Sequence, residues 1–250
     1  MSSSTAEEPS PGIEITGGLQ SVDPGLLHMQ IRRLSIEFQL KDSAGHTIDD
    51  RNRYKNHASF KVEFYGTYGD YRGARINMRH KFAPGTHEII DDQFVFIPGV
   101  LSLKGATYSG DSRYAARTIT LPVAPNLSLE QLLHSFMDMQ VHRFQFAVLN
   151  LLQPNAVVVG CRDFVTQALY QMCNANLVGP QIIDTAPSQD GLVVTDAFDA
   201  LGMRFKSNPM GQGEARPIDK GQFKYFNRVA KPYMPYRGTQ AASDLANRLN

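Results

Sequence analysis

Cys161 is the residue of this chain whose type and position best fit nucleophilic chemistry. It follows three valines and a glycine, and the apolar residues after it recur at i+3, i+4, i+7, i+8 and i+11: Phe164, Val165, Ala168, Leu169 and Met172. This spacing predicts an amphipathic helix with Cys161 in, or just before, its first turn. Unpaired backbone N–H groups and the helix dipole favour negative charge there, so we expect a lowered pKa for the thiol.

The same position also fits a structural cysteine, because free cysteines are among the most buried residue types. Cys173 is interpreted as structural, since it lies near the predicted helix end, where the dipole disfavours a thiolate. The two cysteines are twelve residues apart, which is roughly 18 Å along a helix axis at 1.5 Å per residue. They therefore cannot pair within that helix.

A cysteine nucleophile needs a base for its proton, and the base needs a partner that fixes its tautomer. Seven histidines are available, and His57 is placed best because it begins a predicted strand over residues 57–65. A hairpin loop at residues 66–70 follows, and the return strand carries Asn77. We predict that Asn77 lies beside His57, hydrogen-bonds its imidazole and orients it toward Cys161.

Other residues compete for these roles. Asp70, in the hairpin loop, is the substitute for Asn77. His80 is a second candidate base, on the opposite strand face from Asn77. Asn77 remains the preferred orienting residue, because a strand holds a side chain more rigidly than a loop does.

Two residues are candidates for substrate binding. Arg162, in the first predicted turn of the cysteine helix, is placed to contact an anionic substrate group. Tyr68 clusters with Tyr65 and Tyr71 at the hairpin and is a candidate wall of a cleft. The alternative for Arg162 is a structural role, and the alternative for Tyr68 is cross-strand aromatic packing.

The predicted elements indicate an α+β fold in which an antiparallel sheet of five or six strands packs against a few helices. Alternation of apolar and polar residues predicts a half-buried strand over 34–40, and further strands are expected at 57–65, 73–80, 88–97, 101–103 and 118–123. A capping box of Ser128 and Gln131 predicts a helix start. Residues 144–152 stay open between helix and strand.

Length and composition are those of an ordinary globular protein, with 250 residues, 42% hydrophobic and 20% charged. We expect a disordered tail over residues 1–12 and a single α+β domain over 13–250 with a peripheral C-terminal segment. The tail lacks the apolar run of a signal peptide, and no stretch approaches the ~20 apolar residues of a membrane span. Two cysteines without a disulfide pattern indicate a reducing, cytoplasmic setting.

Charge and motif spacing exclude several classes of partner. The net charge is +1 without a block of like charge, which argues against a nucleic-acid or membrane-surface binder. No Cys-x-x-Cys or His-Glu-x-x-His spacing is present, so neither a metal nor another cofactor is expected. The expected partner is a small-molecule or peptide substrate, and the oligomeric state is left open.

Three segments carry a resemblance to a known group: residues 56–64, 74–78 and 160–165. They resemble the motif blocks of the permuted papain-like proteins, which include the NlpC-like and lecithin retinol acyltransferase-like families. Over about residues 28–226 the chain also resembles a fungal family of uncharacterised proteins with a Gly-Cys-Arg motif. The resemblance implies a circularly permuted papain-like arrangement, with Cys161 as nucleophile, His57 as base, Asn77 as orienting residue, and a thioester acyl-enzyme.

The expected function is a cysteine-dependent hydrolase or acyltransferase, of thiol-protease-like chemistry, acting on an amide, ester or thioester. One alternative is a non-catalytic protein that binds a ligand or partner on the same fold. Another is a biosynthetic enzyme that shapes a cyclisation without covalent catalysis. Ala58 stands where the permuted families usually have an aromatic residue, Asn77 where the acyltransferases usually have a second histidine, and Gly160 where an asparagine precedes the cysteine. The first departure favours the binding alternative.

Overall fold

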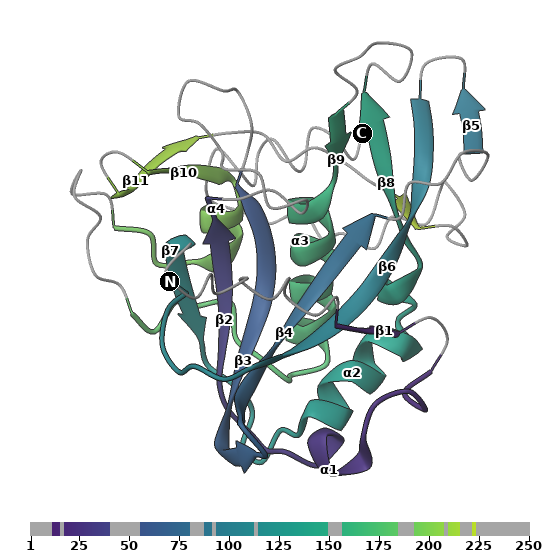
Figure 1. Cartoon of the computed structure of the whole chain (residues 1–250). Helices are drawn as coiled ribbons and strands as arrows, with labels where there is room; N and C mark the ends of the chain where they lie inside the picture. Colours follow the sequence, from purple (N-terminus) through teal and green to yellow (C-terminus); the bar gives the residue numbers. More distant parts are fainter. Residues whose placement is uncertain are drawn as a thin grey trace, which may run out of the picture.

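One large, curled antiparallel sheet with a few helices forms the protein, as a computed structural model shows (Figure 1). The α+β class is therefore as predicted. Of the expected tail only Gly12 lies in the described part, and most of the peripheral C-terminal segment lies outside it. The structure describes residues 12–15, 18–40, 56–80, 88–91, 94–112, 115–149, 157–184, 193–207, 210–215 and 222–223.

The sheet is larger than the predicted five or six strands. Within the described residues it has ten, in the order β12-β8-β6-β4-β3-β2-β7, with β1 and β5 pairing with β6 and β9 pairing with β8. The additional strands include β1, β9 and residues 144–149, which form β8. The predicted segments 88–97 and 101–103 hold β5 and β6, and the long β6 pairs with four other strands. The strands are β1 (Ile13–Ile15), β2 (Ile31–Gln39), β3 (His57–Tyr68), β4 (Tyr71–His80), β5 (Glu88–Asp91), β6 (Phe94–Ala106), β7 (Ala115–Leu121), β8 (Phe144–Leu149), β9 (Val157–Val159) and β12 (Gln222–Phe223).

The helices begin where local sequence signals place them. The predicted capping box is present: Gln131 N–H donates to Ser128 Oγ at 3.2 Å, and Ser128 N–H donates to Gln131 Oε1 at 2.9 Å. A small hairpin of β10 and β11 forms a separate two-stranded sheet that lies against β7. These elements are α1 (Pro24–Leu27), α2 (Leu129–Asp138), the 3-10 helix η1 (Val141–Arg143), α3 (Cys161–Asn174), α4 (Ala197–Leu201), β10 (Met203–Ser207) and β11 (Met210–Ala215).

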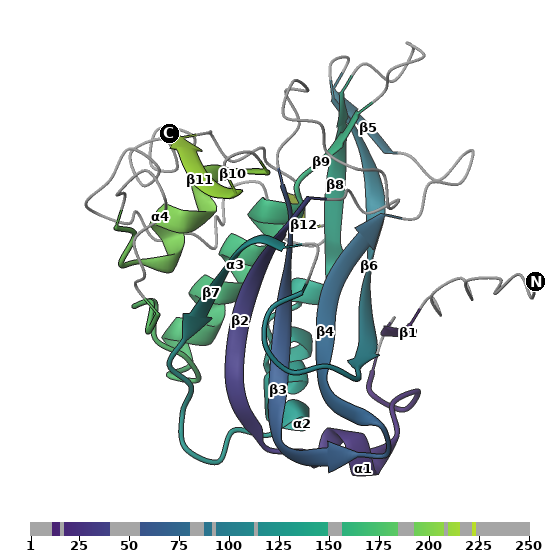
Figure 2. The same ribbon diagram turned by 60° about the vertical axis from the view of Figure 1, so that its left-hand side comes forward.

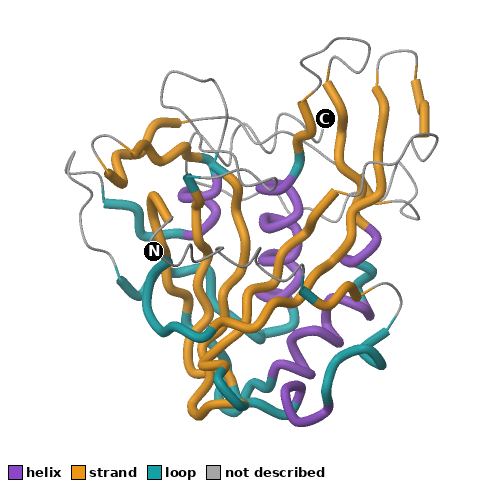
Figure 3. Tube along the Cα trace, viewed as in Figure 1, coloured by secondary structure: helices purple, strands orange, loops and turns teal. Residues whose placement is uncertain are grey.

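Helices α2 and α3 pack on one face of the sheet, as Figures 2 and 3 show. The predicted apolar stripe of α3 is fully buried, with Phe164, Val165, Ala168, Leu169 and Met172 each at most 1% exposed. Ring contacts join the layers, since Phe136 of α2 lies 6.0 Å from Phe60 of β3 and 6.4 Å from Phe164, measured between centroids. This packing sets the position of α3 on β3.

The other face of the sheet is polar, yet it is also buried around the middle of β3. Glu37 is 0% exposed, Lys61 2% and Glu63 4%. The backbone N–H of Gly110 donates to Glu63 at 2.7 Å and that of Ser112 to Glu37 at 3.2 Å, so the segment after β6 covers these carboxylates. The prediction that β2 is only half-buried is therefore wrong, because alternation cannot reveal a covering segment far away in the chain.

Strands β3 and β4 separate at the end nearest α3. Their paired residues reach Phe60 and Ile76 and stop there. Beyond that point β3 still pairs with β2, and β4 still pairs with β6. Figure 1 shows the two strands diverging toward the start of α3. At its start, β3 therefore has one backbone edge that is not paired with β4, and this edge faces α3.

Candidate active site

Helix α3 begins at Cys161, in the predicted position. Gly160 precedes it with φ 128° and ψ −7°, a backbone conformation that favours glycine. The first helical bond runs from Phe164 N–H to Gly160 O at 2.9 Å. Gly160 has no side chain to cap the first turn, and the helix dipole favours negative charge beside the partly exposed Cys161.

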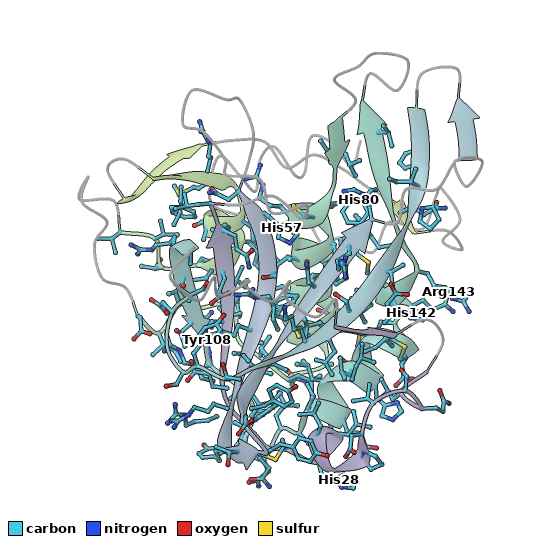
Figure 4. The ribbon with its side chains drawn as sticks, in the orientation of Figure 1. His28, His57, His80, Tyr108, His142 and Arg143 are labelled. Carbon is cyan, nitrogen blue, oxygen red and sulfur yellow. The ribbon has the colours of Figure 1, made fainter. Side chains whose placement is uncertain are left out.

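His57 is held by the predicted partner. Its Nε2 lies 2.8 Å from Oδ1 of Asn77, and the ring is 5% exposed. An amide oxygen only accepts hydrogen bonds, so Nε2 carries the proton, and Nδ1 of the neutral imidazole is left as an acceptor. This is the tautomer that a general base facing the thiol requires. Figure 4 shows His57 near the start of α3.

Cys161 and His57 share a side-chain hydrogen bond, and each changes the pKa of the other. Burial alone would lower the pKa of His57, but the hydrogen bond and charge of Cys161 and the bond to Asn77 outweigh it, so this pKa is raised. Burial alone would raise the pKa of Cys161, but His57 outweighs it, so this pKa is lowered. Both shifts favour a thiolate–imidazolium pair.

Backbone groups at the start of β3 also reach the sulfur. The Cys161 Sγ lies 4.0 Å from the carbonyl oxygen of Asn56. The N–H of Ala58 donates to Sγ and lowers the pKa of the thiol further, as does the charge of Arg162. These contacts are possible because β3 has separated from β4 here.

Arg162 is turned into the protein. It is 2% exposed, and its Nη1 donates to the carbonyl oxygens of Leu201 at 3.0 Å and Met203 at 2.7 Å. This geometry does not support the expected contact of Arg162 with an anionic substrate. The buried guanidinium instead ties α3 to the end of α4 and the start of β10, and its charge acts on Cys161.

Tyr68 is not brought to Cys161. It lies eleven residues after His57 on the same strand, which is roughly 36 Å of chain at 3.3 Å per residue. Its hydroxyl instead hydrogen-bonds the Asp23 carboxylate beside α1. Asp70 lies in the same distant turn, so Asn77 is the orienting residue. The geometry therefore does not support the expectation that Tyr68 forms a wall of a substrate cleft at Cys161.

His80, the second candidate base, lies on the opposite face of β4 from Asn77, as expected. Its ring packs edge-on against Phe146, with centroids 5.8 Å apart. Cys173 also agrees with its structural interpretation, because burial and the charge of Asp196 raise the pKa of its thiol to about 12. Neither residue joins the group around Cys161.

Asn56 lies beside the site, and the sequence did not indicate it. It is 1% exposed, and its side chain pairs with the backbone of Phe205 in both directions: Nδ2 donates to the carbonyl oxygen at 2.9 Å, and Oδ1 accepts from N–H at 2.6 Å. This holds β10 against the start of β3, directly beside His57. The sequence contains no signal for it beyond its position before His57, because Phe205 is 149 residues away.

Comparison with known proteins adds no relative. Searches of protein-family models, of curated proteins and of solved structures each found no match. Among the described residues there is no group of three or more metal-binding side chains and no helix long and apolar enough to cross a membrane. The functional argument therefore depends on the geometry around Cys161.

Proposed function

We propose that the protein is a cysteine-dependent hydrolase or acyltransferase that works through a thioester acyl-enzyme. One observation carries this proposal: Cys161, His57 and Asn77 are hydrogen-bonded in series, with the thiol pKa lowered and the imidazole pKa raised. A structural cysteine has no need of a buried histidine in a fixed tautomer. Cys173 on the same helix has the opposite pKa shift.

The reaction begins with the thiolate of Cys161. It attacks the carbonyl carbon of an amide, ester or thioester, a C–S bond forms, and the carbonyl electron pair moves to oxygen. The imidazolium of His57 gives its proton to the leaving group as the old bond breaks. Water, an amine or an alcohol then gives a proton to His57 and attacks the thioester, which restores the thiolate.

The oxyanion is stabilised at the start of α3. The N–H groups of its first turn have no side-chain cap, and the helix dipole favours negative charge there. The thiolate and the oxyanion thus develop beside the same helix end. Asn77 maintains the tautomer of His57 throughout, and Asn56 and Arg162 hold β10 against the site.

The order of the elements supports a circularly permuted papain-like arrangement as part of this proposal. The histidine strand β3 and the asparagine strand β4 precede the cysteine helix α3 in the chain. The proposal also places the protein in a reducing, cytoplasmic compartment, because the chemistry requires Cys161 as a free thiol. Both cysteines are free in the structure.

The test is the pH dependence of iodoacetamide labelling at Cys161, with Cys173 as the internal control. In the wild type, Cys161 should label with an apparent pKa well below the free-thiol value of ~8.5, and His57→Ala should raise that pKa. The proposal would be contradicted if Cys161 labels slowly, shows no labelling step at low pH, and has the same pH dependence in His57→Ala. A panel of activated acyl compounds, read by intact-protein mass, then identifies which acyl groups form the thioester.

A further inference from the structure

Three cations lie together on the polar face of β4 and β6, next to Asn77. Arg75 and Lys104 are directly opposed across the two strands, and the neighbouring pair on the same face is Asn77 and Ser102. Arg79 is the next same-face residue of β4. Opposed residues have Cα atoms about 5 Å apart, and same-face neighbours are about 6.6 Å apart along a strand. Asn77, which holds His57, therefore lies between two arginines.

The positive charges of Arg75 and Lys104 are only partly neutralised within the described residues. Arg75 donates to Glu37 Oε2 at 2.6 Å and to the Tyr108 hydroxyl at 2.7 Å. Across the described ranges the structure shows no ion pair for the half-buried Lys104. Burial and the charges of Arg75 and Arg79 lower the pKa of Lys104, so the charged lysine is repelled by its neighbours.

Two carboxylates on this face, Glu37 and Glu63, are occupied by other donors, and a third, Glu14 of β1, lies opposite Ser102 of β6. Glu37 binds Arg75 and the N–H of Ser112. Glu63, toward the far end of β3, binds Arg32 at 3.0 Å and the N–H of Gly110 at 2.7 Å. Among the described residues, none of these three carboxylates forms an ion pair with Lys104.

Lys61 is a structural lysine on the same face, and its charge is paired within the protein. It is 2% exposed, it binds Glu63 and the carbonyl oxygen of Gly110, and its ammonium lies 4.3 Å from the centroid of the Tyr108 ring. Lys61 and Lys104 flank Arg75 on its two sides. Lys61 is satisfied by the protein, whereas Lys104 is left with a charge that an external anion can neutralise.

We propose that Lys104, with Arg75 beside it, binds an anionic group, a carboxylate or a phosphate, on the acyl substrate of Cys161. Arginine offers a planar fork of donors to such groups and lysine a compact charge. The group is near the catalytic residues, because the charge of Arg75 acts on His57. This inference rests on the proposed function, and it adds the substrate class: acyl compounds with a negative charge a short distance from the reacting carbonyl.

The test compares three alkylating reagents that differ in charge: N-iodoacetylglycinamide, N-iodoacetylglycine and N-iodoacetyl-O-phosphoethanolamine. Each rate at Cys161 is divided by the rate with a free thiol. In the wild type at low ionic strength, an anionic reagent should be favoured over the neutral one, and Lys104→Gln should reduce that preference about two- to fivefold. The carboxylate and phosphate reagents show which anion is preferred.

Two variants serve as controls. Lys104→Arg keeps the charge and should retain the preference. Arg72→Gln removes the same charge from an exposed position at the far end of β4 and should leave the preference unchanged. If Cys161 reacts normally but Lys104→Gln and the wild type show equal preference, the anion site is overturned while the proposed function stands.

A second measurement does not depend on Cys161. Inorganic phosphate and succinate are each titrated against the melting temperature at constant ionic strength. At least one should raise the melting temperature of the wild type and Arg72→Gln, and raise that of Lys104→Gln less. If Cys161 reacts with no reagent, the proposed function fails, and this measurement alone decides the anion site. An equal response in all three proteins overturns it.

Discussion

The two ends of α3 present the two cysteines of the chain to opposite surroundings. At the start, Cys161 meets the ring of His57, the N–H of Ala58 and the charge of Arg162, and its pKa is lowered although burial opposes this. At the other end, Cys173 meets only burial and the negative charge of Asp196, and its pKa is raised to about 12. Residue type and helix are the same, so the surroundings decide the chemistry of the thiol.

The difference follows from how α3 meets the sheet. Its start lies where β3 and β4 have separated, so backbone and side-chain donors of β3 face the helix. Cys173 lies one residue before the end of α3, where the helix carbonyl groups disfavour a thiolate. The lowered thiol pKa of Cys161 therefore depends on a helix start and an incomplete strand pairing together.

Replacing each cysteine in turn should give the largest difference between the two ends of α3. Cys161→Ala should abolish acyl-enzyme formation, because no other group at the site can form the thioester. Cys173→Ala should retain full activity, with a loss of stability of about 1 kcal/mol from the smaller side chain. Intact-protein mass after incubation with an activated acyl compound measures both. An acyl adduct on Cys161→Ala would contradict the assignment.

The pH dependence of activity should report the ionised pair of Cys161 and His57. The thiol pKa of Cys161 is lowered and the imidazole pKa of His57 is raised, so the ionised pair exists between these two values. Activity should rise as Cys161 loses its proton and fall at higher pH as His57 loses its own, which gives a bell. Below the thiol pKa we expect about a tenfold loss of kcat/KM per pH unit. A rate that rises steadily through the ordinary thiol range would show that the pair does not form.

Asn56→Ala should loosen the start of α3 without touching its end. The substitution leaves the backbone N–H and carbonyl of Phe205 without their partner, so we expect a loss of about 1–3 kcal/mol in the free energy of unfolding. Labelling at Cys161 should change, and labelling at Cys173 should not. Asn174→Ala, at the exposed end of α3, is the matched control and should change neither. Denaturant unfolding and cysteine labelling measure the two effects.

Asn77→Ala should have the smallest effect. It removes the neutral hydrogen bond that fixes the tautomer of His57, which is worth about 0.5–1.5 kcal/mol or roughly two- to thirteenfold in kcat/KM. The high-pH limb should move to lower pH, because the bond to Asn77 raises the pKa of His57. Asp70→Ala, in the distant hairpin turn, should leave rate and profile unchanged. An equal effect of both substitutions would show that Asn77 does not orient the ring.

Local patterns predicted the parts of the site that depend on neighbours in the chain. The start of α3 at Cys161 followed from apolar spacing, and the start of α2 from its capping box. The hairpin around Gly69 brought Asn77 back to His57, because a short turn sets the pairing of its two strands. The role of Arg162 was misjudged, since periodicity places a residue on a helix but does not show which distant carbonyl groups approach it.

The sequence by itself determined the elements, the order of His57, Asn77 and Cys161, and a cysteine at a helix start, since each depends on contacts within a few residues. Only the tertiary structure decided that His57 meets Cys161, that β3 leaves β4 beside the sulfur, and that Asn56 binds Phe205. The physical reason is that such contacts depend on strand order and layer packing. The same packing covers Glu37 and Glu63 and leaves Lys104 without an ion pair in the described residues.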